Sequence, residues 1–222
     1  MQSTFSSSRL VRLLGEWTPV DTEPPGMDVA ERLGLWLNAF DAIGLQAAHQ
    51  SIRAIEAATP RERAGAAGPA AGTLAGDLQK LRATLAQAVA QPVEDDGTLA
   101  PYQQRHQKLQ RDMEQLIPPF RDHARQVLGR ASPRLRQLAA LDAVLERALA
   151  AREQKVLPSV GTHLQRRFQH LRRTQPQDAE PGAWLDTFRQ DWRQALLAEL
   201  DVRLEPVAGL VDALNNPSKH PE

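Results

Sequence analysis

An apolar stripe at helical spacing runs through the last forty or so residues of the chain. From Trp184 onward, large apolar residues recur at every third or fourth position: Leu185, Phe188, Trp192, Leu196, Leu200, Leu204, Val207, Val211 and Leu214. Steps of three and four place side chains on one face of an α-helix, whereas a strand alternates with a period of two. The stripe therefore predicts a long helix that packs against other helices, and it carries little information about chemistry.

Stripes with the same period predict further helices along the chain. They cover residues 9–17, 28–47, 74–90, 101–128 and 133–171. In the fourth of these, the predicted buried stripe is Tyr102, Leu109, Met113, Leu116, Phe120 and Val127. In the fifth, it includes Leu135, Leu138, Leu141, Leu145, Leu149, Val160, Leu164 and Phe168.

Prolines mark the expected bends of these helices. Ser132 and Pro133 form a suitable N-cap and first-turn pair for the fifth helix. The stripe stays in phase across Pro118 and its neighbour, which favours a kink over a helix end, although an internal proline costs about 3 kcal/mol. Pro158 is also interpreted as internal to a continuing helix, and the last helix is expected to bend or break near Pro206.

These elements predict an all-α fold, an elongated bundle of long kinked helices with antiparallel coiled-coil-like hairpins. Residues 1–58 form an N-terminal helical segment, 59–73 an Ala/Gly/Pro-rich linker, 74–215 the long-helix bundle and 216–222 a polar tail. Helices of such length rarely bury their apolar stripe within one copy of a chain this size. We therefore expect a homo-oligomer or a partner helix.

Composition excludes several classes of protein. The 222 residues are 41% hydrophobic, which suffices for a core, and they include no cysteine, which excludes disulfides and thiolate-bound metals. Lys+Arg and Asp+Glu each number 27, which disfavours a general nucleic-acid coat. No run approaches the about 20 apolar residues that span a bilayer, and the polar start lacks an apolar signal core. We expect no membrane spanning and a cytoplasmic location.

The search for reactive residues favours a protein that is not an enzyme. None of the six histidines stands in a zinc or di-iron motif, and neither a phosphate-binding loop nor a nucleophile motif is present. No catalytic, cofactor or metal site is predicted. A helical-bundle metalloenzyme that uses His163 or His170 with a carboxylate is kept as an alternative.

A basic cluster closes the fifth helix. Arg166, Arg167, Arg172 and Arg173 fall within a stretch, 163–173, that contains no acid. Arginines near a helix C-terminus favourably meet its dipole, and acids such as Glu180, Asp186 and Asp191 follow as partners. The alternative is a contact strip for nucleic acid or an anionic membrane.

Two polar residues, Asn38 and Asp41, lie on an otherwise apolar predicted helix. A buried carboxylate needs a partner, and Arg9, Arg12 or Arg32 could supply one. We interpret these residues as a structural pairing. The tryptophans 17, 36, 184 and 192 are interpreted as core anchors.

Residues 9–48 carry a motif that resembles an uncharacterised proteobacterial family, a domain of unknown function. The matching segments are 9–14 (RLVRLL), 30–33 (AERL) with Trp36-Leu37, and 41–48, in which Asp41-Ala42-Ile43 precede Leu45 and Ala47-Ala48. The resemblance implies a gene neighbourhood with predicted membrane proteins of the ion-driven stator type and with peptidoglycan-binding proteins. It implies a soluble accessory of a cell-envelope assembly, and it assigns no catalytic residue.

We predict a non-catalytic helical interaction or scaffold protein without cofactors. Its partner would be a protein, such as a membrane-complex component, or a second copy of the chain, bound helix against helix. Binding of nucleic acid or an anionic membrane through residues 163–173 is the first alternative, and the metalloenzyme is the second.

Overall fold

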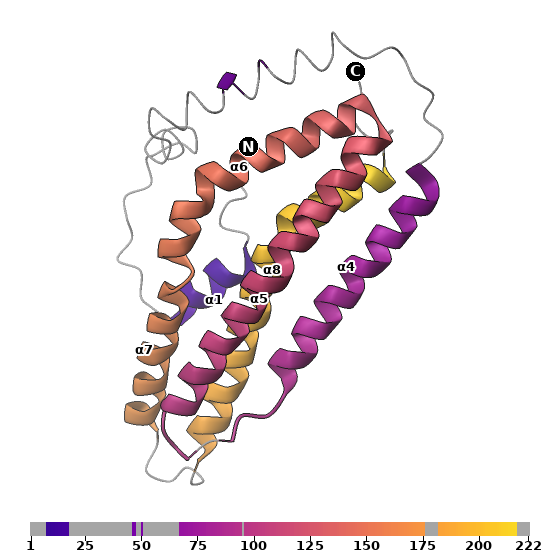
Figure 1. Ribbon diagram of the computed structural model, residues 1–222. Coiled ribbons are helices and arrows are strands. Elements are labelled where there is room, and N and C mark those ends of the chain that lie inside the picture. The colour runs from indigo at the N-terminus through magenta and orange to yellow at the C-terminus, as the bar shows by residue number, and fades with distance from the viewer. Residues whose placement is uncertain are drawn as a thin grey trace. The chain divides into compact units, whose positions relative to one another are not determined.

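A computed structural model describes residues 8–17, 46–47, 50, 67–94, 96–175 and 182–216. It contains the helices α1 (Arg9–Trp17), α4 (Ala67–Ala90), α5 (Ala100–Ala131), α6 (Pro133–Val156), α7 (Ser159–Thr174) and α8 (Ala183–Asn215) (Figure 1). No strand occurs among these described residues, which confirms the predicted all-α fold. Kinks and coiled-coil packing stay predictions. The predicted helix over 28–47, with Asn38 and Asp41, lies outside the described residues.

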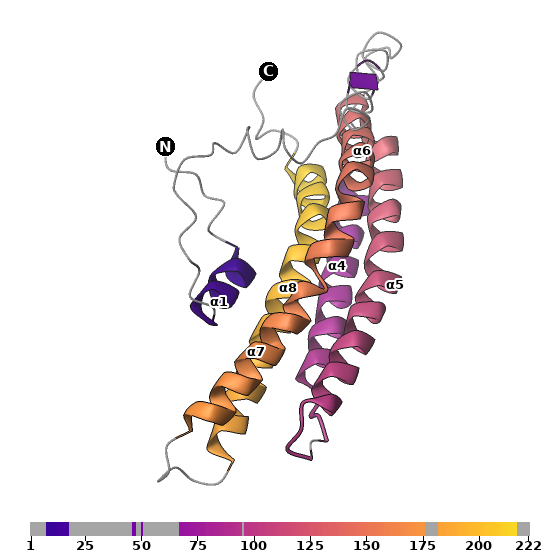
Figure 2. The ribbon, with the colours of Figure 1, turned by 90° about the vertical axis from the view of Figure 1, so that its left-hand side faces the viewer.

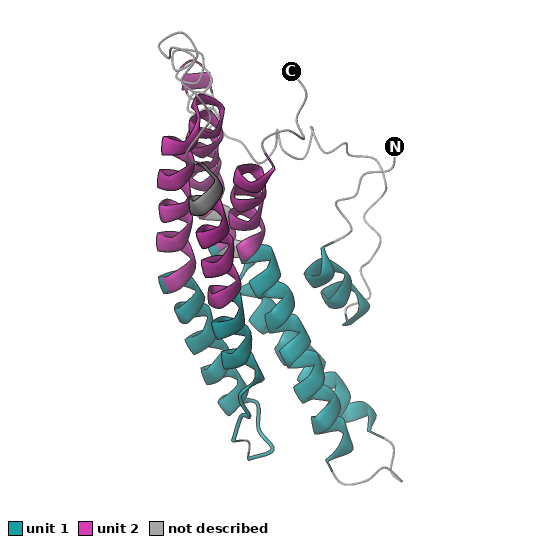
Figure 3. Cartoon of the chain, turned by 90° about the vertical axis from the view of Figure 1, so that its right-hand side faces the viewer, with its two compact units in different colours: residues 1–25, 82–115, 154–203 teal, residues 26–81, 116–153, 204–222 magenta. Residues whose placement is uncertain are grey.

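The chain forms two compact units, coloured separately in Figure 3. Unit 1 comprises Met1–Pro25, Arg82–Gln115 and Gln154–Arg203, and therefore holds α1, α7, the last part of α4 and the first parts of α5 and α8. Unit 2 comprises Gly26–Leu81, Leu116–Glu153 and Leu204–Glu222, and therefore holds the first part of α4, most of α6 and the last parts of α5 and α8. The four-part division expected from the sequence stays a prediction.

Several helix ends lie at the positions that local sequence features predicted. α1 has the bounds predicted from its short apolar pattern, and α4 ends at Ala90 as expected. The Oγ atom of Ser132 accepts a hydrogen bond of 3.2 Å from the backbone N–H of Leu135, which is the contact that an N-cap serine makes. Pro133 then opens α6, as predicted.

Two predicted helix boundaries were wrong. α4 begins at Ala67, so residues 67–73 are helical instead of linker, because alanine favours helix and Pro69 falls in the first turn, where no N–H is needed. The helix predicted to continue across Pro158 instead ends at Val156, and α7 begins at Ser159. A proline ring clashes with the carbonyl of the preceding turn, so a new helix begins after it.

The other internal prolines do not end their helices. α5 continues through Pro118 and Pro119, as predicted, and also extends past Gly129 to Ala131. α8 runs unbroken through Pro206, where a bend or a break was expected. In both cases the buried stripe continues on either side of the proline, so packing outweighs the lost hydrogen bond.

The apolar stripe of α8 is buried as predicted, and every member after Trp184 is at most 8% exposed. In unit 1 its aromatic residues meet those of α5 and α7 edge to face. The ring of Phe188 lies 5.1 Å from that of Tyr102 and 4.9 Å from that of Phe168. Tyr102 also contacts Trp192, and Phe168 contacts Trp184. Figure 2 shows α7 running alongside this part of α8.

Helix α1 packs against α7 in unit 1. Its Leu10 and Leu13 are buried, while Val11 on the opposite side is 56% exposed. At the end of α1, the guanidinium carbon of Arg167 lies 5.8 Å from the centre of the Trp17 ring, a cation–π contact. Segments about 150 residues apart in sequence therefore meet in space.

Within unit 2, the predicted buried faces of α5 and α6 were partly wrong. Leu116, Leu141 and Leu145 are 43%, 36% and 38% exposed. In α5, Ile117 is buried instead of Leu116. It lies four residues after Met113 and four before the buried Arg121, so the buried face follows steps of four at this point. In α6 the buried face runs through Leu135, Ala139 and Asp142. The reason is electrostatic, because charged residues of the two helices pair within this face.

Candidate functional site

The most deeply buried charge of the described residues is Glu199 of α8, which is 0% exposed within unit 1. Its Oε1 atom accepts hydrogen bonds from Gln110 Nε2 at 3.0 Å and from Arg203 Nη2 at 2.8 Å. Its Oε2 atom lies 3.3 Å from Nε2 of His106, a residue only 5% exposed. Donors from α5 and from the next turn of α8 thus surround one carboxylate.

This arrangement keeps Glu199 ionised. Burial, the largest influence, opposes its charge, yet the hydrogen bond from His106, the charge of Arg203 and the hydrogen bond from Gln110 together lower the pKa of Glu199 below its ordinary value. Because an ionised carboxylate only accepts hydrogen bonds, the contact with His106 requires a proton on Nε2 of that ring. The buried glutamate is therefore a satisfied anion.

A paired histidine and glutamate resemble part of a catalytic relay, but the surroundings of His106 favour a structural role. A Cβ atom added to Gly161 of α7 would lie 3.7 Å from Nδ1 of His106, so the second ring nitrogen faces a residue that has no side chain. A catalytic histidine needs a nucleophile or a substrate proton within hydrogen-bond reach of that nitrogen. We interpret the pair as an anchor that joins α5 and α8 beside α7.

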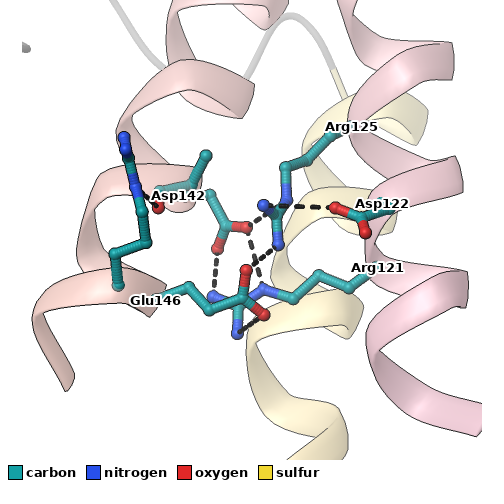
Figure 4. A network of polar contacts seen from close by, with 7 residues as sticks. Arg121, Asp122, Arg125, Asp142 and Glu146 are labelled. Atoms are coloured by element: carbon teal, nitrogen blue, oxygen red, sulfur yellow. Dashed lines mark hydrogen bonds and ion pairs between the residues drawn. The ribbon is translucent and has the colours of Figure 1, made fainter. Parts of the chain in front are cut away.

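A second charged cluster lies in unit 2, between α5 and α6 (Figure 4). Arg121 donates two hydrogen bonds to Asp142, from Nε at 2.8 Å and from Nη2 at 2.6 Å. Arg125 Nε lies 3.1 Å from Asp142, and another nitrogen of the same guanidinium binds Glu146. Arg121 and Asp142 are 11% exposed in their side chains and Arg125 is 13% exposed. The cluster is therefore a largely desolvated network, and we call it the α5–α6 ion network.

The acids around Arg121 favour its charged form. Burial lowers the pKa of Arg121 and is the largest influence, but its hydrogen bonds to Asp142 and the nearby carboxylates of Asp142, Glu146 and Glu153 more than offset it and raise that pKa. Two parallel N–H···O bonds also fix the plane of the guanidinium. The network therefore sets the rotation of α6 about its own axis, in addition to its distance from α5.

Neither cluster was predicted from the sequence, although a signal for both was present. The buried stripe of α5 runs through positions 102, 106, 109, 113, 117, 121, 124 and 128, with unbroken steps of three and four. His106 and Arg121 occupy two of these positions. A charged residue in phase with an apolar stripe predicts a buried partner elsewhere, whereas the stripe predicted for α5 contained its apolar members alone.

The predicted basic cluster of α7 is divided by the structure. Arg167 is paired with Asp191, its Nε atom 2.8 Å from Oδ2, which confirms one of the ion pairs expected from the sequence. Arg166, Arg172 and Arg173 are exposed, and the last two lie in the final turn of α7. Asp186 instead pairs with Arg189 on its own helix. Glu180 and the predicted pairing of Asn38 and Asp41 lie outside the described residues.

The histidines of the metalloenzyme alternative lie on α7. Burial, aided by the charge of Arg166, lowers the pKa of His163, so His163 is neutral near pH 7; His170 is exposed. Within the described ranges, no three histidine, aspartate or glutamate side chains lie close enough to hold a metal ion. A small cavity of about 210 Å³ in unit 1 is lined by Pro92, Val93, Tyr102, Arg189, Trp192 and Arg193. Its lining includes neither His106 nor Glu199.

The fold and the two clusters define the class of protein: an all-α chain whose helices are joined by apolar stripes and by buried ion pairs. The chain belongs to the family described as "Protein of unknown function (DUF3348)", whose model matches residues 1–216. No match was found among curated proteins or among solved structures. None of the described helices is both long and apolar enough to cross a membrane.

Proposed function

We propose that this protein is a non-catalytic interaction protein, and that a partner helix docks on α6. The observation that carries the proposal is the exposure of Leu141 and Leu145, at 36% and 38%, on one face of that helix. Leu138 and Leu149, which flank them on the same face, are half-buried. We call these four residues the α6 leucine stripe.

The spacing of the stripe supports this interpretation. Its members lie three, four and four residues apart, which is the spacing with which a helix presents apolar anchors to another helix. Exposed leucines that occur singly need no explanation, but an aligned row of them marks an interaction surface. These leucines belong to the apolar stripe that was predicted to be buried.

The α5–α6 ion network, which lies on the face of α6 that meets α5, also supports the proposal. Asp142 and Glu146 each follow a stripe leucine by one residue, so they lie about 100° further around the helix. Because these acids bind Arg121 and Arg125 of α5, α6 cannot rotate to bury Leu141 and Leu145 without breaking the network. The leucines are thereby held outward for a partner.

We propose an amphipathic helix of a protein partner as the occupant, and self-association of the chain as its simplest form. The proposed setting is the cytoplasm, as an accessory of a cell-envelope assembly, and this part rests on the sequence resemblance of residues 9–48. Burial of the exposed part of each leucine would contribute about 0.5–1 kcal/mol, which is modest for one residue and substantial for a row.

The test compares the wild-type chain with the double variant Leu141→Gln/Leu145→Gln. Size-exclusion chromatography with light scattering, chemical cross-linking and affinity purification from the native host would be run on both. The matched control is Leu116→Gln, an exposed leucine of α5 outside the stripe. We expect the wild type and the control to self-associate or to retain the same partner, and the double variant to lose it while keeping its helicity. A wild-type chain that stays monomeric and retains no partner would overturn the proposal, as would a double variant that binds like the control.

A further inference from the structure

Helices α1 and α7 concentrate positive charge on one part of unit 1. Together they contain six arginines, namely Arg9, Arg12, Arg166, Arg167, Arg172 and Arg173, and Glu16 is their only acid. The whole chain carries no net charge, with 27 basic and 27 acidic residues. The local excess of positive charge on α1 and α7 is therefore balanced elsewhere in the chain, and these two helices, which the sequence separates, are brought together by the fold.

Most of this charge faces solvent. Five of the six arginines are exposed, and the exception is Arg167, which binds Asp191 and covers the Trp17 ring. At about 1.5 Å per residue, α1 is about 13 Å long and α7 about 24 Å. The arginines of each helix therefore lie within one to two Debye lengths of one another, about 10 Å each in moderate salt. Arg9 and Arg12 are three residues apart and Arg166 and Arg173 are seven apart, so each pair lies on one face of its helix. We call this region the α1–α7 basic surface.

The exposed side chain of Val11 favours a membrane over a nucleic acid as the anion bound. Val11 is 56% exposed on α1, about 100° around the helix from Arg12, while Leu10 and Leu13 are buried. A bilayer offers phosphates at its surface and an apolar layer directly beneath, so it accommodates arginines and a protruding valine together. A nucleic-acid duplex offers phosphates with no apolar layer beneath them, and proteins that bind single strands stack bases on exposed aromatic rings. Here Phe168 is buried and Trp17 lies against Arg167.

We propose that the α1–α7 basic surface binds the surface of an anionic phospholipid membrane. The guanidinium groups contact lipid phosphates, for which their planar geometry is suited, and Val11 enters the boundary of the acyl layer. The binding is peripheral and reversible, and it depends on salt. It uses neither the α6 leucine stripe nor any residue of unit 2, so it stands independently of the proposed function.

The test is flotation of the full-length protein with vesicles of defined composition. Vesicles of phosphatidylcholine alone are compared with equimolar phosphatidylcholine and phosphatidylglycerol, at low and at moderate salt. We expect binding to the mixed vesicles only, weakened by salt. Each arginine contributes about a fivefold change in partitioning near an anionic surface, so Arg166→Gln/Arg173→Gln should bind about 25-fold more weakly.

Two further variants make the result specific. Arg111→Gln/Arg193→Gln removes the same charge from exposed positions of unit 1 outside the surface, and we expect it to bind like the wild type. Val11→Ser should weaken binding to vesicles without changing the net charge. Duplex DNA and single-stranded RNA would be assayed by mobility shift with the same proteins. The proposal is overturned if the wild type does not bind the mixed vesicles, if the control weakens binding equally, or if Val11→Ser leaves binding unchanged. Binding of nucleic acid through these arginines, without binding of vesicles, would replace it.

Discussion

Replacing Asp142 by alanine should destabilise the protein, because it removes the acid shared by two largely buried arginines. Asp142 accepts two hydrogen bonds from the Arg121 guanidinium and lies 3.1 Å from Arg125 Nε. After the substitution, Glu146 is the remaining acid of the network, and it lies 3.4 Å from Arg121 Nη1. Both guanidinium groups would then rely on Glu146, which is itself 29% exposed, and only Arg125 would have a further partner, the exposed Asp122.

The size of the effect follows from burial. Removing one partner of a fully buried ion pair costs about 3–5 kcal/mol, because the other charge stays desolvated. The arginines here retain 11–13% exposure and keep Glu146 as a partner, so we expect about 2–3 kcal/mol for Asp142→Ala. The double variant Arg121→Met/Asp142→Leu removes both charges of the pair. It should therefore recover most of the free energy of unfolding that Asp142→Ala loses.

Equilibrium unfolding in urea, followed by circular dichroism, would measure the free energy of unfolding of each variant. Asp122→Ala is the matched control, since Asp122 also pairs with Arg125 but is 64% exposed. Exposed ion pairs are worth about 0–1 kcal/mol, so the control should change stability little. The reasoning fails if the two aspartate variants lose equal stability, or if the double variant is no more stable than Asp142→Ala.

Three other substitutions test individual contacts. Glu199→Gln removes the stability that the lowered pKa of Glu199 contributes. This contribution is complete above about pH 4.5 and is lost as the pH falls through the lower folded-state pKa. A plot of melting temperature against pH should therefore fall less steeply on its acid side for Glu199→Gln than for the wild type or the exposed control Glu205→Gln. Gly161→Ala should stabilise the protein by about 0.5–1 kcal/mol in a thermal melt, because alanine favours helix and its methyl group would lie 3.7 Å from the His106 ring, an ordinary contact distance. A loss of stability would show that the His106 ring cannot accommodate the methyl group. Ser132→Ala should cost about 1 kcal/mol in urea unfolding through loss of the α6 N-cap, and an unchanged midpoint would contradict the capping role.

The apolar parts of the fold were predictable from local rules. The stripe of α8, the bounds of α1 and the cap of α6 each depend on residues within a few turns of one another. Leu116 and Leu141 were assigned to the core because an apolar stripe alone does not reveal which of two adjacent faces is buried. That choice was decided by Arg121 and Asp142, whose pairing depends on helix α5 meeting helix α6.

The candidate sites were less predictable, because they too depend on which helices meet. The ion pair between Arg167 and Asp191 was expected because the two residues flank one short connection. The contacts of Glu199 join positions 89 and 93 residues apart, and the packing of α1 on α7 joins positions about 150 residues apart. Neither distance leaves a periodic signal in the sequence, and a single sequence offers no other way to pair charges.

The buried carboxylate of α8 has a consequence for how the helices align during folding. Leucine and valine side chains repeat at every turn, so an apolar stripe fits its neighbours almost equally well after a slip of one turn, about 5.4 Å. Such a slip in unit 1 would carry Glu199 away from His106 and Gln110 and leave a charge in the core without its donors from α5. A single polar side chain among interchangeable apolar ones thus makes the native alignment distinguishable from its shifted competitors.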